Sequence, residues 1–260
     1  MYKFARSLKK VLERSPLVLV YAIGGLIGIC LFYNTKKRVT AFKNVKAAFP
    51  EKSNTQCMRI VKKSFIYFGV SIMESFIPER LYKGVRIEGR EHLDARAGGG
   101  VLAAIHEGSW ELYNCSVAQT TRYAIFAKTQ KVRSLDTFLN EVRSRMRLGV
   151  CATLKEAIRL LQQGYFLGFV VDHGAETDAL MVDFFGHLVP TPRGAVHLAR
   201  KYAKSIFPCF GYRQRMCHTI EIGSPIELEH KDDKEVLAQL NSYFQQQITR
   251  HPHEYLWSYK

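Results

Sequence analysis

The chain has 260 residues, of which 47% are hydrophobic and 23% charged. This composition excludes a largely disordered protein, and the length suits one domain or at most two. The formal net charge of +15 calls for an anionic partner, such as nucleic acid, an anionic membrane surface or a phosphate-bearing substrate or carrier. The six cysteines are widely spaced and form no CxxC pair, which argues against a zinc site and a disulfide scaffold and favours a reduced, cytosol-facing protein.

The N-terminal region contains an uncharged stretch, PLVLVYAIGGLIGICLFY, at residues 16–33. Its 18 residues are just long enough for a helix that crosses a membrane. Basic residues flank it on both sides, so the charges do not define an orientation. A single-pass anchor, a hairpin or tilted helix that returns to the cytoplasmic face, and a buried core helix are all open. We favour membrane attachment and assign residues 1–48 to an anchor with basic flanks, followed by a globular domain at residues 49–260.

Helical spacing of apolar residues in VTAFKNVKAAFPEKS predicts a helix that ends before Pro50. Ser53 or Asn54 can cap the next helix, which runs through CMRIVKKSFIYFGVSIMESF and has one broad apolar face. From Gly100 on, predicted strands alternate with predicted helices. The strands are VLAAI, YAIFAK, YFLGFVVD and SIFPCFGYR, and the helices are LDTFLNEVRSRMR, TLKEAIRLLQQG, GAVHLARKYA and EVLAQLNSYFQQQITRH. This alternation predicts an α/β sheet preceded by a helical portion.

The first candidate site is AAIHEGSWELYN, at residues 103–114, where a predicted strand meets a predicted helix. On a continuous helix His106 and Glu111 would point about 140° apart, but they can meet if His106 lies in the turn and Glu111 in the first helical turn. A neutral imidazole oriented by a carboxylate is what a general base needs to deprotonate a hydroxyl. Geometry does not exclude Glu107 as the partner. These polar residues can also simply satisfy the exposed N–H groups of the helix.

Two further segments carry candidate residues. Asp172 and His173 end a predicted buried strand, where open α/β sheets place their ligands. The loop FFGHLVPTPRG, with Arg193 at its end, can contact an acyl chain or a phosphate, and ordinary loop packing is the alternative. In VRSRMRLG, Arg143 and Arg145 suit a phosphorylated group, although a solvated basic face explains them equally well. The histidine spacings show no HExxH-type metal pattern.

Taken together, these segments resemble the bacterial lipid A biosynthesis acyltransferases, which include lauroyl and myristoyl transferases. HEGSWE resembles their H-x4-D/E box in the H-x-G-x-W-E form, and NVKAAFPEKS resembles their N-x3-A-F-P-E element. VRSRMRLG, FVVDHG, VDFFGHLVPTPRGAVHLARKYAKSIFPCF and YLWSYK follow in the family's order. The resemblance covers nearly the whole chain. One departure is His173, which stands where the family usually has glutamine.

The resemblance implies a glycerolipid-acyltransferase-like fold at residues 49–260, with a mixed sheet flanked by helices, and an enzyme that acylates a membrane lipid. The donor would be an acyl-carrier-protein or CoA thioester, and the acceptor a hydroxyl of a lipid A precursor. His106 would be the general base, oriented by Glu111, and Asp172 would shape the pocket. Phosphate or oxyanion contacts would come from arginines, in the order Arg143, Arg145 and Arg193. No metal or tightly bound cofactor is required.

The resemblance also implies a bacterial inner-membrane protein whose catalytic domain lies on the cytoplasmic side, against an anionic membrane surface. Other acceptors stay open, namely a lysophospholipid, a glycolipid mannoside or an aminolipid. A non-catalytic, basic membrane-binding module is the alternative from a different class. Nucleic acid is not expected, because the chain has no recognisable binding motif and many of its basic residues flank the apolar segment.

Overall fold

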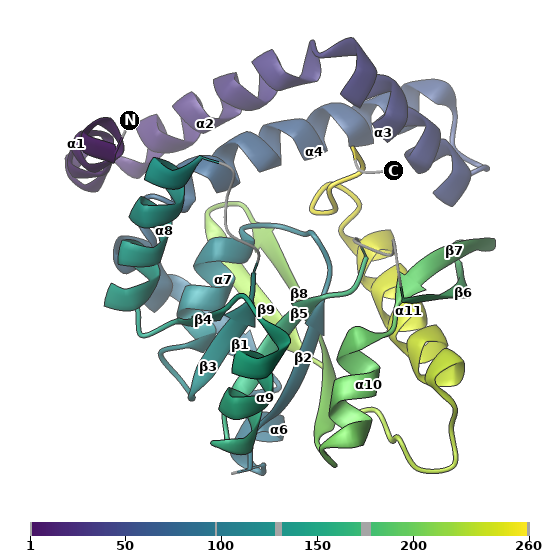
Figure 1. Cartoon of the computed structure of the whole chain (residues 1–260). Helices are drawn as coiled ribbons and strands as arrows, with labels where there is room; N and C mark the ends of the chain where they lie inside the picture. Colours follow the sequence, from purple (N-terminus) through teal and green to yellow (C-terminus); the bar gives the residue numbers. More distant parts are fainter. Residues whose placement is uncertain (1, 97, 128–131, 173–177, 259–260) are drawn as a thin grey trace.

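The computed structural model describes residues 2–96, 98–127, 132–172 and 178–258. Its centre is a sheet of strand order β1-β9-β8-β2-β5-β3-β4 (Figure 1), in which only β8 and β9 pair antiparallel. The strands are β1 (Val85–Glu88), β2 (Gly100–Ala104), β3 (Tyr123–Phe126), β4 (Gly149–Cys151), β5 (Phe166–Val170), β8 (Ser205–Gln214) and β9 (Cys217–Ile222). The predicted α/β fold with a mixed sheet flanked by helices is confirmed.

The two faces of the sheet bury alternate residues of each strand, because successive side chains of a strand point in opposite directions. Along β2, Val101 and Ala103 belong to one core cluster and Leu102 to the other. The first cluster includes helices α9 (Leu154–Gln162), α10 (Gly194–Lys201) and α11 (Asp233–Arg250), and the second includes α7 (Trp110–Val117). Thr153 caps α9 with a capping box, as the sequence predicts.

An N-terminal layer of helices lies across one end of the sheet (Figure 1). It consists of α1 (Tyr2–Arg14), α2 (Leu17–Phe32), α3 (Thr35–Ala48) and α4 (Asn54–Glu74). Ser53 caps α4 with a capping box, which settles the choice between Ser53 and Asn54. Helices α2 and α4 touch through glycines: a Cβ on Gly28 would lie 2.2 Å from the Phe65 carbonyl oxygen, and one on Gly69 would lie 2.2 Å from the Gly24 carbonyl oxygen.

The apolar N-terminal segment forms α2, which is 16 residues long and packs along α4. Among the described residues, no single helix has the length and apolar character needed to cross a membrane. Helix α2 and residues Lys36–Ala48 of α3 together have sufficient length and apolar character, but the angle between them is 91°. Pro16 precedes α2, and Asn34 caps the start of α3.

The N-terminal layer is also tied to the rest of the chain by polar contacts. The buried Lys9 ammonium lies 2.5 Å from the Glu79 carboxylate and donates a hydrogen bond to the Phe76 carbonyl. Glu79 belongs to the short helix α5 (Pro78–Leu81), which is followed by a 3-10 turn at Tyr82–Gly84. The division of the chain at residue 48 stays a prediction.

The segment FFGHLVPTPRG, predicted as an apolar loop before α10, instead contains the turn and the second strand of an antiparallel hairpin. The strands of this hairpin are β6 (Ala179–Phe184) and β7 (His187–Pro192). Phe185 and Gly186 form its turn, both with positive φ, at 56° and 76°. Two consecutive positive φ angles match the twist of a hairpin. Prolines 190 and 192 are tolerated because β7 pairs on one side only. The remaining helices are α6 (Glu91–Asp94) and α8 (Arg133–Arg145).

Candidate active site

His106 lies just after β2, and its ring is held by Asp172, just after β5. The His106 Nδ1 atom is 2.9 Å from Asp172 Oδ1, and the backbone N–H of His106 donates to Asp172 Oδ2 at 3.0 Å. One carboxylate therefore fixes both the backbone and the ring of the same residue. With the Nδ1 proton assigned to this hydrogen bond, Nε2 is the basic nitrogen, which is the arrangement that a general base needs.

The geometry of the sheet explains this pairing. Strands β2 and β5 are parallel neighbours, with Ala104 opposite Val170, so the residues that follow them leave the sheet side by side. Polar residues at the carboxyl ends of neighbouring parallel strands are therefore brought together. Both residues were expected to lie at strand ends, but Asp172 was expected only to shape the pocket. The structure places it against the imidazole.

Glu111, the expected partner of His106, makes a different contact. It lies in the first turn of α7, and both of its carboxylate oxygens accept hydrogen bonds from Arg143 of α8, Nε to Oε1 at 2.7 Å and Nη2 to Oε2 at 2.9 Å. Both side chains are buried. In the described contacts the imidazole is thus oriented by Asp172 and not by Glu111, because the first turn of α7 directs Glu111 towards α8. A catalytic role for Glu111 stays a prediction.

The three candidate arginines do not form one cluster. Burial disfavours the charged form of Arg143, but the hydrogen bonds and charge of Glu111 outweigh this and raise its pKa. Arg145 is half exposed and pairs with Glu141 on its own helix, and Arg193 pairs with Asp178 near the start of α10. Of the three, only Arg143 lines a described cavity beside His106. His173, the departure from the family pattern, lies outside the described residues.

Glu107 is a second buried acid next to His106. Its Oε1 atom accepts the Gly211 N–H at 3.2 Å, and its Oε2 atom has no hydrogen-bond partner among the described residues. Burial, with the nearby charge of Asp172, raises the pKa of the Glu107 carboxyl well above its ordinary value. The carboxyl therefore keeps its proton to a higher pH than an exposed glutamate does. Glu107, left open from the sequence as a partner of His106, faces Gly211 instead.

The raised pKa of Glu107 predicts a pH-dependent stability. A folded-state pKa above the unfolded value of about 4.3 favours the fold below that pH and weakens it as the pH rises. A Glu107→Gln variant lacks this titration. Above pH ~4.3, we expect the free energy of unfolding of the variant to rise relative to that of the wild type. The difference should grow by up to about 1.4 kcal/mol for each pH unit. Urea unfolding of both proteins across pH measures this, and parallel pH profiles would contradict it.

The turn that carries His106 is held from both sides. The Gly108 N–H donates to the Glu254 carbonyl at 2.9 Å, and the Leu256 N–H donates to the His106 carbonyl at 3.0 Å. From α4, Ser71 Oγ donates to the Gly108 carbonyl at 2.8 Å. The sequence identified the segment around Leu256 only by its resemblance to the family's aromatic signature. The contact of this segment with the turn that carries His106 exists only in the folded chain.

A buried cluster of charges lies behind this turn, and no pattern in the sequence indicates it. Arg213 of β8 donates to Glu74 at 2.8 Å and has a second carboxylate, that of Glu254, at 3.6 Å. His218 Nε2 lies 2.9 Å from the other oxygen of Glu74. Burial opposes ionisation of Glu74, but Arg213 and His218 overcome it and lower its pKa to about 2. The cluster links α4, β8, β9 and the segment around Glu254.

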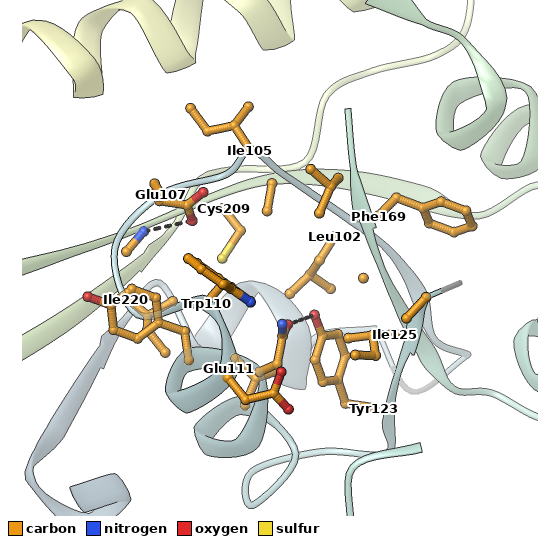
Figure 2. A pocket seen from close by; sticks show the side chains of 18 of the residues that line it. Leu102, Ile105, Glu107, Trp110, Glu111, Tyr123, Ile125, Phe169, Cys209 and Ile220 are labelled. Carbon is orange, nitrogen blue, oxygen red and sulfur yellow. Dashed lines mark hydrogen bonds between the residues drawn. The ribbon is translucent and has the colours of Figure 1, made fainter. Parts of the chain in front are cut away.

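An apolar cavity of about 280 Å³, here called the core cavity, lies beside His106 (Figure 2). Its wall includes Glu107, Glu111, Arg143 and apolar side chains from β2, β3, β5, β8 and β9, among them Leu102, Ile125, Phe169, Cys209 and Ile220. Ile105, just after β2, also lines it. A polar pair also lines it, because Tyr123 donates its hydroxyl to Asn114 Oδ1 at 2.7 Å. Such a space has room for an apolar ligand that reaches His106.

A second cavity of about 360 Å³, here called the hairpin cavity, lies on the Asp172 side. Its wall comes from α3, the β6–β7 hairpin and the segment around Trp257, and the residues that line it include Ala47, Ala48, Phe184, Phe185, Val189, Tyr255 and Trp257. Ile105 lines both cavities, and the hydrogen-bonded His106 and Asp172 each line one of them. Among the described residues, no group of three or more acidic, histidine or cysteine side chains is placed to hold a metal ion.

The chain is similar to known acyltransferases. The chain is 26% identical over 246 residues to "Lipid A biosynthesis acyltransferase 2" of Shigella flexneri, covering 86% of this chain and 77% of that protein. It is 23% identical to "Lipid A biosynthesis lauroyltransferase" of Escherichia coli strain K12, covering 94% and 85%. A solved structure, the 1-acyl-sn-glycerophosphate acyltransferase PlsC of Thermotoga maritima, aligns with a TM-score of 0.43 at 13% identity, covering 90% of this chain and 96% of that one. The family model for bacterial lipid A biosynthesis acyltransferase matches residues 7–260, and the chain therefore belongs to that family.

Proposed function

We propose that this acyltransferase moves a fatty acyl chain from an acyl-carrier-protein or CoA thioester to a hydroxyl of a lipid A precursor. The observation that supports this most directly is the hydrogen-bonded pair of His106 and Asp172 at the wall of an apolar cavity. The pair supplies a base for a substrate hydroxyl, and the cavity supplies room for an acyl chain. The net charge of +15 suits donors and acceptors that carry phosphate.

In the proposed reaction, His106 Nε2 takes the proton of the acceptor hydroxyl while the oxygen attacks the thioester carbonyl carbon. Asp172 holds the ring and stabilises the imidazolium that forms. The tetrahedral intermediate collapses by breaking its C–S bond. The leaving thiolate then takes the proton from the imidazolium, so the base is restored and the products are an ester and a free thiol.

The negative oxygen of the intermediate needs hydrogen-bond donors. Arg143 is engaged by Glu111 on two of its nitrogens and by Asn140 on a third, so it is poorly placed to reach a substrate. Helix α7 begins at Trp110 and has no side-chain cap on its first N–H groups. We therefore propose the start of α7 as the oxyanion site, with Glu111 acting through Arg143 to fix that helix against α8.

The experiment that tests the activity offers purified protein both kinds of donor, acyl-carrier protein and CoA, each with several acyl chains. Each donor is paired with a lipid A precursor and, separately, with lysophospholipids, and the products are identified by mass. We expect a lipid A precursor one acyl chain heavier. Acylation of lysophospholipid alone would contradict the proposed acceptor, and no transfer to any acceptor would contradict the activity.

We further propose that the protein lies on the cytoplasmic side of the inner membrane, attached by the outer face of α1 and α2. Large apolar side chains are exposed along this face, at Phe4, Val11, Val18, Leu19 and Leu26. Phe4 is 69% exposed and Leu26 is 62% exposed, which is unusual for a face of such length. Basic residues of α1 and α3 flank it, and this combination suits an anionic lipid surface.

Placing two glutamates on this face, Leu19→Glu with Leu26→Glu, should release the protein from membranes. Both side chains are exposed, so the fold should survive, while the apolar area available to lipid falls. We expect affinity for vesicles of anionic phospholipid to drop by roughly ten-fold or more. Leu154→Glu, on the exposed side of α9, is the matched control and should bind as the wild type does. Equal binding by all three proteins would rule out this face.

A further inference from the structure

The hairpin cavity has no role in the chemistry described so far, although it lies next to the reacting histidine. Its boundary with the core cavity is narrow: Ile105 lines both, and the 2.9 Å hydrogen bond between His106 and Asp172 joins one wall to the other. The hairpin cavity is the larger of the two, at about 360 Å³ against about 280 Å³. A space of this size with mainly apolar walls suits a lipid chain.

The proposed reaction needs room for two apolar chains that meet at one point. The donor is an acyl thioester, and the acceptor is a lipid that already carries fatty acyl groups. The thioester carbonyl and the acceptor hydroxyl must both approach His106 Nε2. Two cavities that diverge from the His106–Asp172 pair can hold one chain each and direct their polar ends to the same place.

The walls of the cavities indicate which chain each one takes. The core cavity extends between the sheet and α7, where Leu102, Ile125 and Ile220 line it (Figure 2). A single linear chain, delivered from a carrier, can thread into such a space. Part of the wall of the hairpin cavity instead comes from the N-terminal layer, at Ala47 and Ala48 of α3.

Helix α3 follows α2 directly (Figure 1). The exposed apolar residues of α2 belong to the surface proposed to contact the membrane. The exposed residues of α3 include Lys36, Lys37 and Lys43. A lipid whose head group stays at the membrane surface can therefore present its phosphate to α3 and insert a chain under it. Lysine ammonium groups suit this contact because they bind phosphate as point charges.

We propose that the hairpin cavity binds an acyl chain of the acceptor lipid, while the core cavity binds the chain of the donor. This inference rests on the proposed function. It assigns a role to the β6–β7 hairpin and to the aromatic segment around Trp257, whose side chains close the cavity opposite α3. Acceptor choice and donor chain length then depend on different residues.

Two identical substitutions, one in each cavity, test the assignment. Ala48→Phe adds a ring at the hairpin cavity, and Ala127→Phe adds one at the core cavity; both alanines are half-buried. Each variant is assayed as the full chain, with a series of donors of different chain length and with lipid A precursors whose acyl chains are short or long. The readouts are the KM for each precursor and the donor chain length with the highest kcat/KM.

We expect Ala48→Phe to raise the KM for the long-chain precursor about ten-fold or more, to spare the short-chain precursor, and to leave the preferred donor length unchanged. Ala127→Phe should shift the preference to shorter donors and leave the KM for either precursor unchanged. The reverse pattern, or a KM for the precursor that Ala48→Phe does not alter, would overturn the assignment.

A smaller change, Ala48→Leu, covers the case in which the phenylalanine variant does not fold, and should give the same pattern with a smaller shift. Failure of the proposed function is separate from failure of this assignment. If wild-type protein transfers no acyl chain to any precursor, the function is wrong. If the wild type is active and the Ala48 variants change only the donor preference, the function stands and the assignment of the two cavities is wrong.

Discussion

Replacing His106 with alanine should slow acyl transfer by about 10²–10⁴-fold for every donor and acceptor, the range that a positioned general base contributes. The imidazole of His106 lines the core cavity, and no other histidine is found among the described residues that line it. The rate is measured with saturating donor and acceptor, so that the loss is seen in kcat. Thermal unfolding of the variant checks that the fold is intact. An unchanged rate in a folded variant would remove His106 from the mechanism.

Two acids are candidates for orienting His106, namely Asp172 and Glu111, and their variants should differ in effect. Asp172→Asn keeps an oxygen for the backbone N–H of His106 but no longer fixes the Nδ1 proton or balances the imidazolium, so we expect kcat to fall about 10²-fold with little change in thermal stability. Glu111→Gln breaks a buried ion pair with Arg143 and should mainly lower stability. A large kcat loss for Glu111→Gln, with a near-normal rate for Asp172→Asn, would make Glu111 the orienting acid.

Replacing Arg213 with methionine should destabilise the fold by about 3–5 kcal/mol, because it leaves the Glu74 and Glu254 carboxylates buried without their counter-charge. The change in free energy of unfolding is measured by urea denaturation. Arg145→Met is the matched control: it breaks an exposed ion pair on α8 and should cost less than about 1 kcal/mol. A second change, Glu74→Gln, should recover part of the loss. Equal effects of the two arginine variants would contradict a structural role for this cluster.

Local sequence signals predicted much of the fold. Ser53 and Thr153 precede amphipathic stretches and carry glutamine or glutamate three residues on, which is why the helix starts at α4 and α9 were readable. The strands that bury both faces, such as β2, are continuous apolar runs. By contrast, β4 has only three residues, and the prolines of β7 argue against a strand, so these two elements were missed.

The candidate site was less predictable because it depends on the order of strands. His106 and Asp172 could each be placed after a strand, but the sequence does not tell which strand neighbours β2. Their hydrogen bond follows from the adjacency of β2 and β5 alone. Arg213 and Glu74 are 139 residues apart, and no periodic pattern links them. The resemblance pointed to Glu111 as the acid that orients the imidazole, whereas in the described contacts Asp172 is the acid that lies against it.

The close contact of α2 with α4 limits which changes the N-terminal layer can accept. At Gly24, Gly28 and Gly69 the two backbones approach so closely that any side chain would collide with the other helix. Val20 and Phe32 of α2 are part of the buried cores. Deleting α2 would therefore expose the surface of α4 and the parts of the buried cores that α2 covers. Variants that test the proposed membrane contact therefore have to keep this helix and change only the residues on its outer surface.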